Sequence, residues 1–250
     1  MLHIQSSGIG PDVVFLHGTP TTTDIFDGVV AELARGCRCH VVHLPGYGGS
    51  PAPTLPVTLE ALHAALEATL KNLGGEPMTL VGFSSGAWHA LALALGGRLP
   101  VVRVALLAGA AELASEEREG SRQFAAALRA GADLKPLAAL RFLGPGSQAD
   151  PARRASVEAW LDAAPREVIA SELEAFAGAP SLLDDLSRLE VPVLARVGAA
   201  DVATPVVKSQ AIASRVKRAT LQIVPEVGHA LPLEDGPGCA AALAAFITGA

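Results

Sequence analysis

Short apolar runs alternate with longer alanine- and leucine-rich stretches along most of this chain. The runs end at glycine or proline turns and are mostly apolar throughout, as strands covered on both faces by helices should be. The longer stretches have helical period, and this alternation is typical of parallel strands joined by crossover helices. The expected strands are Val13–Leu16, Cys39–Leu44, Met78–Phe83, Val101–Leu107, Val191–Val197 and Thr220–Val224. The expected helices are Leu59–Leu73, Gly86–Leu95, Pro205–Val216 and Cys239–Thr248. The pattern therefore predicts an α/β protein with a mostly parallel central sheet.

The alternation stops after Gly109. From there to Arg188 the sequence is helix-like, contains no convincing strand, and is broken near Gly144 and at Pro165. Neither an internal repeat nor a long polar linker divides the chain into independent domains. We expect a core made of residues 1–110 and 187–250, with residues 111–186 inserted as a helical cap.

Composition and charge exclude several classes of partner. The chain has 250 residues, is 50% hydrophobic and carries a net charge of −6, which suits one large domain and leaves no basic stripe for nucleic acid. Its three cysteines, Cys37, Cys39 and Cys239, are an odd number without repeated spacing, which favours a reducing cytoplasm over a disulfide-stapled secreted module. No signal-like or membrane-spanning apolar segment is visible, so neither targeting nor membrane association is expected.

One pentapeptide carries a chemical signal. The apolar run MTLVGF leads into Gly82-Phe83-Ser84-Ser85-Gly86, and a helical stretch follows. A G-x-S-x-G at a strand-to-helix junction is the pattern of a nucleophile elbow, which holds a serine hydroxyl clear of the sheet at a helix N-terminus. The alternative is a tight turn whose glycines serve packing alone, so the surrounding residues have to decide.

A serine nucleophile needs a base, and the base needs an orienting acid. Asp201 follows the apolar run VPVLARVG, and His229 follows the last expected strand, so Ser84, Asp201 and His229 occur in the required order. Asp201 could instead cap the next helix. The next acid to consider is Glu112, after the strand Val101–Leu107.

Acyl transfer also needs hydrogen-bond donors for a developing oxyanion. The first long strand ends in His17-Gly18-Thr19-Pro20, which can aim the Thr19 N–H at the site, and the Ser85 N–H would be the second donor. All these residues follow strand ends, where an open α/β sheet collects its ligand.

The ordered motifs resemble those of the α/β-hydrolase superfamily. They are HGTP, LPGYGGS, GFSSG, GAAD followed by TP, and GHALPLED, and they span nearly the whole core. The resemblance implies the α/β-hydrolase fold, with a helical cap inserted after the family's sixth strand. The segment MLHIQSS resembles the second half of the family's opening hairpin, so one edge strand is expected to be missing. Small capped members include carboxylesterases, enol-lactonases, carbon–carbon bond hydrolases and cofactor-free relatives of haloperoxidases, and no cofactor is expected.

Three positions depart from the family's pattern. His43 stands where relatives often carry aspartate, and Ala87 replaces a glycine often found after the elbow. Ser84 is a serine, so the resemblance to haloalkane dehalogenases and epoxide hydrolases, which use aspartate, stops at the fold.

The expected activity is hydrolysis of a small carboxylic ester or lactone through an acyl-enzyme. The same residues could also serve carbon–carbon bond hydrolysis, cofactor-free oxygenation, perhydrolysis or, without turnover, ligand binding, because a fold does not fix a function. The expected partner is a small-molecule substrate, and monomer and homodimer both remain open.

Other residues invite a functional interpretation. Cys37, Cys39 and His40 look like a metal cluster, but alternation along a strand sends the thiols and the imidazole to opposite faces, so no metal is expected. Trp88 could line an acyl pocket or pack in the core. The same two readings apply to a set of apolar cap residues, Phe124, Leu140, Phe142, Trp160 and Phe176. Cap arginines that could bind a carboxylate or simply be solvated are Arg141, Arg153, Arg154 and Arg166.

Overall fold

The expected sheet is present in the computed structural model, which describes residues 1–249. Its strands are β1 (Ile4–Ser7), β2 (Asp12–Leu16), β3 (Arg38–Val42), β4 (Met78–Phe83), β5 (Val101–Leu107), β6 (Val193–Gly198) and β7 (Ala219–Val224). Within the described residues they form a seven-stranded sheet in the order β1-β3-β2-β4-β5-β6-β7. All pairs are parallel except β1 with β3. The prediction of a mostly parallel α/β sheet is therefore confirmed, and Ala250 lies outside the described residues.

Strand burial follows position in the sheet. Every residue of β2 and β4 is buried, because helices cover both faces of these central strands. The edge strands β1 and β7 are mostly half-buried or exposed. Strand β1 occupies the place expected for MLHIQSS, as an antiparallel edge with Ile4 opposite Val42.

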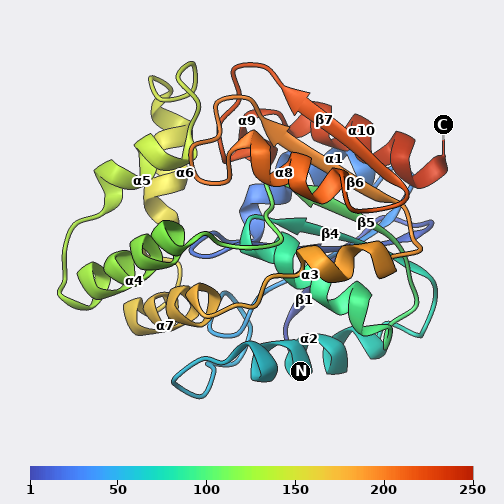
Figure 1. The fold of residues 1–250 in the computed structure, drawn as a ribbon, viewed down its shortest axis with the longest axis horizontal. Coiled ribbons are helices and arrows are strands. Elements are labelled where there is room, and N and C mark those ends of the chain that lie inside the picture. Colours follow the sequence, from blue (N-terminus) through green and yellow to red (C-terminus); the bar gives the residue numbers. More distant parts are fainter. Residues whose placement is uncertain (250) are drawn as a thin grey trace.

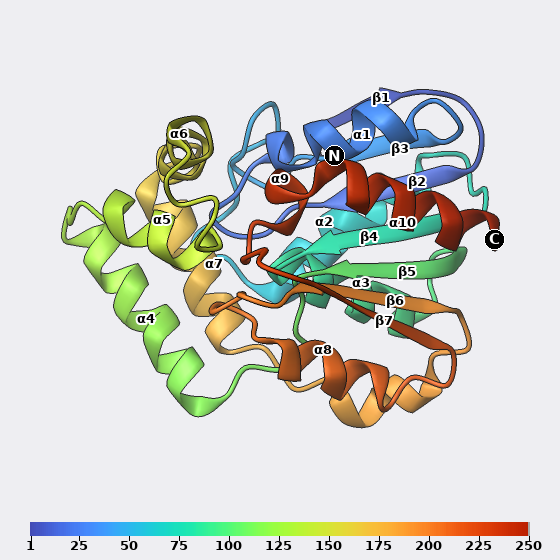
Figure 2. The same cartoon turned by 90° about the horizontal axis from the view of Figure 1, so that it is seen from above.

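Helices flank the sheet on both faces. They are α1 (Asp27–Leu33), α2 (Leu59–Lys71), α3 (Ser85–Gly96), α8 (Val206–Ala213), α9 (Leu231–Glu234) and α10 (Gly236–Thr248). Short 3₁₀ helices are η1 (Thr23–Phe26) and η2 (Leu183–Arg188). Helices α1 and α10 pack together on one face, and α2, α3 and α8 lie on the other (Figures 1 and 2). Every helix in residues 1–249 falls short of the length and apolar character needed to span a membrane.

A separate group of helices lies between β5 and β6 in the sequence. It consists of α4 (Ser115–Arg129), α5 (Lys135–Phe142), α6 (Pro151–Trp160) and α7 (Arg166–Ala177). In both views these helices, coloured green to yellow, lie together beyond one end of the sheet (Figures 1 and 2). Helix α4 packs on α7, and α5 packs on α6. We call α4 to α7 the cap helices; the division of the chain into core and cap domains stays a prediction.

Some element boundaries differ from the sequence-based expectation. The sequence pattern does not predict helix α1, because its buried apolar stripe is short, consisting of Val29 and Leu33, and Gly28 lies in its first turn. Helix α10 begins three residues before the expected Cys239, at Gly236, because Pro237 is accommodated in its first turn. The carboxyl ends of the strands nevertheless lie at or close to the predicted positions.

Candidate active site

Ser84 occupies a sharp turn between β4 and α3. Its φ angle is 53°, in the left-handed region that non-glycine residues rarely adopt. The turn is possible because glycines precede and follow it closely. A Cβ on Gly82 would lie 2.3 Å from the carbonyl oxygen of Gly86, and a Cβ on Gly86 would lie 2.2 Å from that of Leu16. The glycines therefore let α3 approach β2 and β4, and Ser84 is held at the helix N-terminus.

Asp201 lies on the loop between β6 and α8, and its two oxygens have different partners. Oδ1 accepts hydrogen bonds from the backbone N–H groups of Ala203 and Thr204, both at 2.8 Å. Oδ2 lies 2.9 Å from Nδ1 of His229. Oδ1 thus stabilises the turn that leads to α8, but it does not cap that helix, whose N-cap is Pro205 without a side-chain hydrogen bond, and the other oxygen meets the histidine.

His229 connects the acid to the serine. It lies on the loop after β7, its side chain is buried, and its Nε2 lies 2.9 Å from Ser84 Oγ. The ring packs between Phe83 and Phe142, with centroid separations of 5.1 and 5.2 Å. With Asp201 accepting from Nδ1–H, Nε2 is left to accept the Ser84 proton.

The electrostatics of Asp201 favour its ionised form. Burial alone raises the pKa of this carboxyl, but the charge and hydrogen bond of His229 and the hydrogen bonds of Thr204 outweigh burial and hold the pKa below its ordinary value. The Thr204 hydroxyl lies 2.9 Å from Asp201 Oδ2 and 2.8 Å from the carbonyl oxygen of Ala108. Thr204 belongs to the TP of a recognised motif, but its contact with the acid was not predicted.

The loop after β2 lies directly against Ser84. A Cβ on Gly18 would be 2.7 Å from Ser84 Cβ, so only glycine allows this approach. The next residue, Thr19, donates its backbone N–H to Ser85 Oγ at 3.0 Å. Ser85 is the first residue of α3, and the N–H groups of a helix's first turn have no acceptor within the helix. The Ser85 N–H therefore lies next to Ser84, whereas the Thr19 N–H is paired with Ser85 Oγ and would have to leave that oxygen to meet an oxyanion.

The loop carrying His229 is tied to the cap helices by Glu234. Its carboxylate accepts from the backbone N–H of Gly228 at 3.0 Å and from that of Gly144 at 2.9 Å. The backbone N–H of Ala230 donates to the carbonyl oxygen of Phe142 at 2.7 Å. Glu234 stands in the GHALPLED motif, but no local pattern indicates that it bridges two distant segments.

A buried carboxyl on α7, not predicted from the sequence, reaches the same region. Glu172 Oε2 accepts hydrogen bonds from the hydroxyls of Thr19, at 3.0 Å, and Tyr47, at 2.8 Å. Burial raises the pKa of Glu172 to about 7, against the lowering effect of these two hydrogen bonds. In the sequence, Glu172 has the same amphipathic-helix context as a solvent-exposed glutamate. Only the tertiary structure therefore reveals its contacts with Thr19 and Tyr47.

The aromatic candidates mostly pack in the interior. Trp88 is buried, stacks on His63 at a centroid separation of 5.4 Å and donates its indole N–H to the carbonyl oxygen of Pro180. Trp160 is buried and donates to the carboxylate of Asp24. Leu140 is 59% exposed and does not roof the site.

The remaining cap candidates divide between contact with the site and exposure to solvent. Phe142 contacts the His229 ring, as described above, and Phe124 and Phe176 are half-buried. Arg153 donates to Ser147 Oγ and to the carbonyl oxygen of Glu234. The other three candidate arginines, Arg141, Arg154 and Arg166, are exposed.

The cysteines lie away from Ser84. Cys37, Cys39 and Cys239 are buried free thiols, and burial raises the pKa of Cys39 to about 12. The His40 ring lies 2.9 Å from Asp12 and 2.8 Å from Ser6. Residues 1–249 contain no group of three or more His, Cys, Asp or Glu side chains arranged to hold a metal ion.

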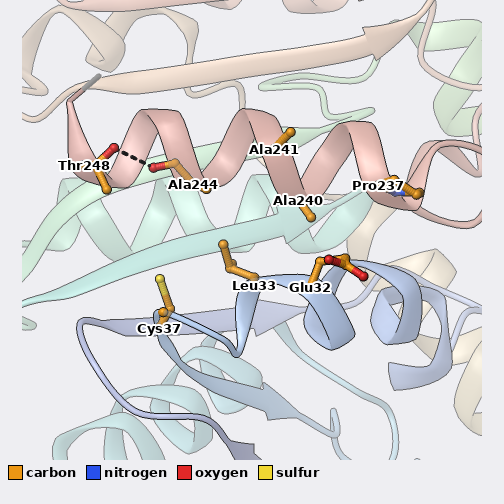
Figure 3. Close-up of a pocket in the computed structure, with 9 residues that line it drawn as sticks. Glu32, Leu33, Cys37, Pro237, Ala240, Ala241, Ala244 and Thr248 are labelled. Atoms are coloured by element: carbon orange, nitrogen blue, oxygen red, sulfur yellow. Dashed lines mark hydrogen bonds between the residues drawn. The ribbon is translucent and has the colours of Figure 1, made fainter.

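A groove of about 350 Å³ lies between α1 and α10. The side chains of Leu33 and Cys37 point across it toward the alanines of α10 (Figure 3). Its lining residues are Glu32, Leu33, Gly36, Cys37, Pro237, Ala240, Ala241, Ala244 and Thr248. The groove is thus separate from the loops that carry Ser84, Asp201 and His229.

Comparison with known proteins agrees with the fold. A model of the alpha/beta hydrolase family matches residues 13–243. A pimeloyl-[acyl-carrier protein] methyl ester esterase of Chromobacterium violaceum is 30% identical over 241 residues, covering 92% of this chain and 91% of that protein. An esterase of the same name from Nitrosomonas europaea is 36% identical over 107 residues, but the match spans only 43% of this chain and 40% of that protein.

Solved structures show the same architecture. A thermophilic esterase from Thermogutta terrifontis superposes with a TM-score of 0.92 at 24% identity, covering 99% of this chain and 93% of that one. The enol-lactonase of Burkholderia xenovorans LB400 gives a TM-score of 0.88 at 24% identity, covering 99% and 96%. At this identity the structures establish the fold alone. The family match and the full-length relative, by contrast, show that the chain belongs to the alpha/beta hydrolase family.

Proposed function

We propose that this protein is a serine hydrolase that cleaves a small carboxylic ester or lactone through an acyl-enzyme intermediate. The observation that carries the proposal is the continuous hydrogen-bonded chain from Ser84 Oγ through His229 to Asp201, with both links at 2.9 Å. These are the contacts that general-base activation of a serine requires.

In the first step, Ser84 Oγ attacks the substrate's carbonyl carbon while His229 Nε2 removes the hydroxyl proton. The carbonyl oxygen becomes an oxyanion, which the N–H groups of Thr19 and Ser85 stabilise. Asp201 holds the imidazole and stabilises its positive charge. The imidazolium then protonates the leaving alkoxide oxygen as its bond to the acyl carbon breaks, leaving the acyl group on Ser84 Oγ.

In the second step, water repeats the attack on the acyl carbon. His229 Nε2 accepts a proton from the water, and a second oxyanion occupies the same two donors. When the bond to Ser84 Oγ breaks, Nε2 returns that proton to the serine, which restores the free enzyme and releases a carboxylic acid. In a lactone the leaving oxygen remains attached to the acyl group, so a hydroxy acid is released.

We further propose that residues 111–186 act as the cap over a core of residues 1–110 and 187–250. Support comes from the contact of Phe142 with His229 and from the hydrogen bond of Glu172 to Thr19. Because the cap helices reach the site at these points, they would form much of the substrate pocket. Two relatives are named as pimeloyl-[acyl-carrier protein] methyl ester esterases. The first natural substrates to test are therefore methyl esters of dicarboxylic acids, both free and carried on an acyl-carrier protein.

The test compares the wild type with Ser84→Ala on p-nitrophenyl esters from acetate to dodecanoate, on two lactones and on those methyl esters. We expect loss of turnover of about 10⁶-fold in the variant, with folding unchanged. Full activity of Ser84→Ala would refute the mechanism. If the folded wild type hydrolyses none of these substrates, labelling by a fluorophosphonate decides whether Ser84 is activated. Labelling would then direct attention to carbon–carbon bond hydrolysis, oxygenation or perhydrolysis, and no labelling to ligand binding.

A further inference from the structure

One carboxyl group joins the cap helices to the loop beside the nucleophile. Glu172 on α7 is 4% exposed, and its Oε2 accepts from the hydroxyls of both Thr19 and Tyr47. These two residues lie on different loops, one after β2 and the other after β3. The hydrogen bonds of a single oxygen atom therefore connect three segments that are far apart in the sequence, namely α7, the loop after β2 and the loop after β3.

Burying this carboxyl lowers the stability of the folded protein. Within residues 1–249, Oε1 of the same carboxyl is buried without a hydrogen-bond partner. A buried polar atom left unpaired lowers the stability of the folded protein, and an apolar side chain of similar size would avoid this loss. The position of Glu172 is therefore better explained by what its other oxygen holds than by the stability it adds.

What it holds is the residue that carries the proposed oxyanion donor. Thr19 is half-buried, and its hydroxyl is fixed by Glu172 while its backbone N–H lies 3.0 Å from Ser85 Oγ. Gly18, immediately before it, touches Ser84. A rotation of the Thr19 backbone that moved the donor would also pull its side chain away from the carboxyl.

We propose that Glu172 is a positioning residue for the oxyanion loop, fixing the Thr19 N–H from the cap side through the Thr19 hydroxyl. The proposal rests on the proposed function, because it acts through an oxyanion donor. Since an oxyanion exists in the transition state and not in the bound ester, loss of Glu172 should lower kcat much more than it changes KM.

The charge state of Glu172 matters for the same reason. Of the titratable groups around it, Tyr47 stays neutral because burial and Glu172 raise its pKa well above 10. Burial lowers the pKa of His17, whose ring lies 4.9 Å from that of Tyr47, to about 4. Burial likewise lowers the pKa of His89, which Phe176 of α7 contacts, to about 3. Near neutral pH these neighbours keep one state while Glu172 titrates.

Ionised Glu172 places a negative charge one hydrogen bond away from the residue that must stabilise an oxyanion. Like charges repel, so ionisation should weaken that stabilisation, and kcat should fall as the pH rises through the ionisation of Glu172. Glutamine keeps an oxygen to accept the two hydroxyls but cannot ionise. Glu172→Gln should therefore preserve kcat at pH 6 and lack the alkaline fall.

The experiment measures kcat and KM from pH 6 to 9 on the ester that the wild type hydrolyses best. Glu172→Ala should lose on the order of 10- to 100-fold in kcat, the scale expected for a slightly misplaced reacting group. Ser171→Ala is the matched control. It removes another α7 contact, the hydrogen bond from the Val57 N–H at 2.7 Å, without touching Thr19, and should leave kcat unchanged.

A second variant keeps the proposal testable if Glu172→Ala does not fold. Thr19→Val retains the backbone N–H and loses the hydroxyl, so it should reduce kcat as Glu172→Ala does, and the double variant should be no worse than either. Wild-type kcat in Glu172→Ala or Thr19→Val, or an alkaline fall retained in Glu172→Gln, would overturn the proposal. If Ser84→Ala stays active, the proposed function itself has failed. If Ser84→Ala is inactive and Thr19→Val is not impaired, only the positioning role has failed.

Discussion

Neutralising the buried carboxyl of Glu172 should stabilise the protein at alkaline pH and much less at acid pH. The ordinary pKa of a glutamate carboxyl is 4.5, whereas burial raises that of Glu172 to about 7 in the folded protein. Between these two values the unfolded chain releases a proton that the folded chain keeps. The wild type therefore loses stability as the pH rises through this window, and Glu172→Gln, which has no such proton, does not.

The size of the effect follows from the two pKa values. Each pH unit of separation is worth about 1.4 kcal/mol, so full ionisation of Glu172 lowers the free energy of unfolding of the wild type by about 3 kcal/mol. Part of this loss is already present at pH 5, since the unfolded chain begins to ionise there. The free energy of unfolding of Glu172→Gln relative to wild type should thus rise by about 2.5 kcal/mol between pH 5 and pH 8.5.

Urea unfolding at the two pH values, followed by the fluorescence of the buried Trp88 and Trp160, measures this change. Only the change with pH counts, because any difference in packing between glutamine and glutamate is the same at both values. Glu167→Gln on the same helix is the control. Its exposed carboxyl pairs with Arg129, which lowers its pKa, so its pH-dependent contribution lies below about pH 5 and its removal should leave the difference almost unchanged between pH 5 and 8.5. An equal difference between Glu172→Gln and wild type at pH 5 and 8.5 would refute the reasoning, since it would mean that Glu172 ionises as an exposed carboxyl does.

Three further outcomes are expected. Asp201→Asn should lower kcat by about 10⁴-fold while leaving weak activity, because an amide no longer favours the required histidine tautomer; steady-state kinetics will show this, and full retention would direct attention to Glu112. Gly86→Ala should lower the free energy of unfolding by about 3 kcal/mol or more, since its Cβ would lie 2.2 Å from the Leu16 carbonyl oxygen; an unchanged urea midpoint would contradict this packing. Burial keeps His89 neutral, so this residue contributes stability that is present above pH 6.5 and lost as the pH falls toward 3. His89→Gln should therefore show a weaker acid dependence of the urea midpoint between pH 6.5 and 4. An unaltered dependence would mean that His89 titrates normally.

The places of the strands along the chain, and the residues that follow them, could be predicted because they depend on local signals. Ser84, Asp201 and His229 each stand a few residues after an apolar run, and parallel strands bring their carboxyl ends to one edge. The sequence thus indicated which side chains would lie together without any knowledge of their exact placement. The structure adds their distances and the separate partners of the two Asp201 oxygens.

The contacts of the cap helices could not be predicted, because they depend on how α7 packs against loops more than a hundred residues earlier. Glu172 lies in SELEAFAG, where periodicity gives no reason to distinguish it from the neighbouring Glu174. Burial distinguishes them: Glu174 pairs with Arg129 at the surface, while Glu172 faces Tyr47 and Thr19. A single sequence does not encode that difference in any local pattern.

The hydrogen bonds of Glu172 and Glu234 connect the cap helices, and the segment between α5 and α6, to the loops around Ser84. Glu172 holds the loop that carries the proposed oxyanion donor, and Glu234 ties the His229 loop to the backbone of Gly144. A change in the cap that alters substrate choice would therefore also move groups on which the chemical step depends. Substitutions on the cap helices should thus change kcat together with KM where they disturb these two carboxylates, and KM alone where they do not.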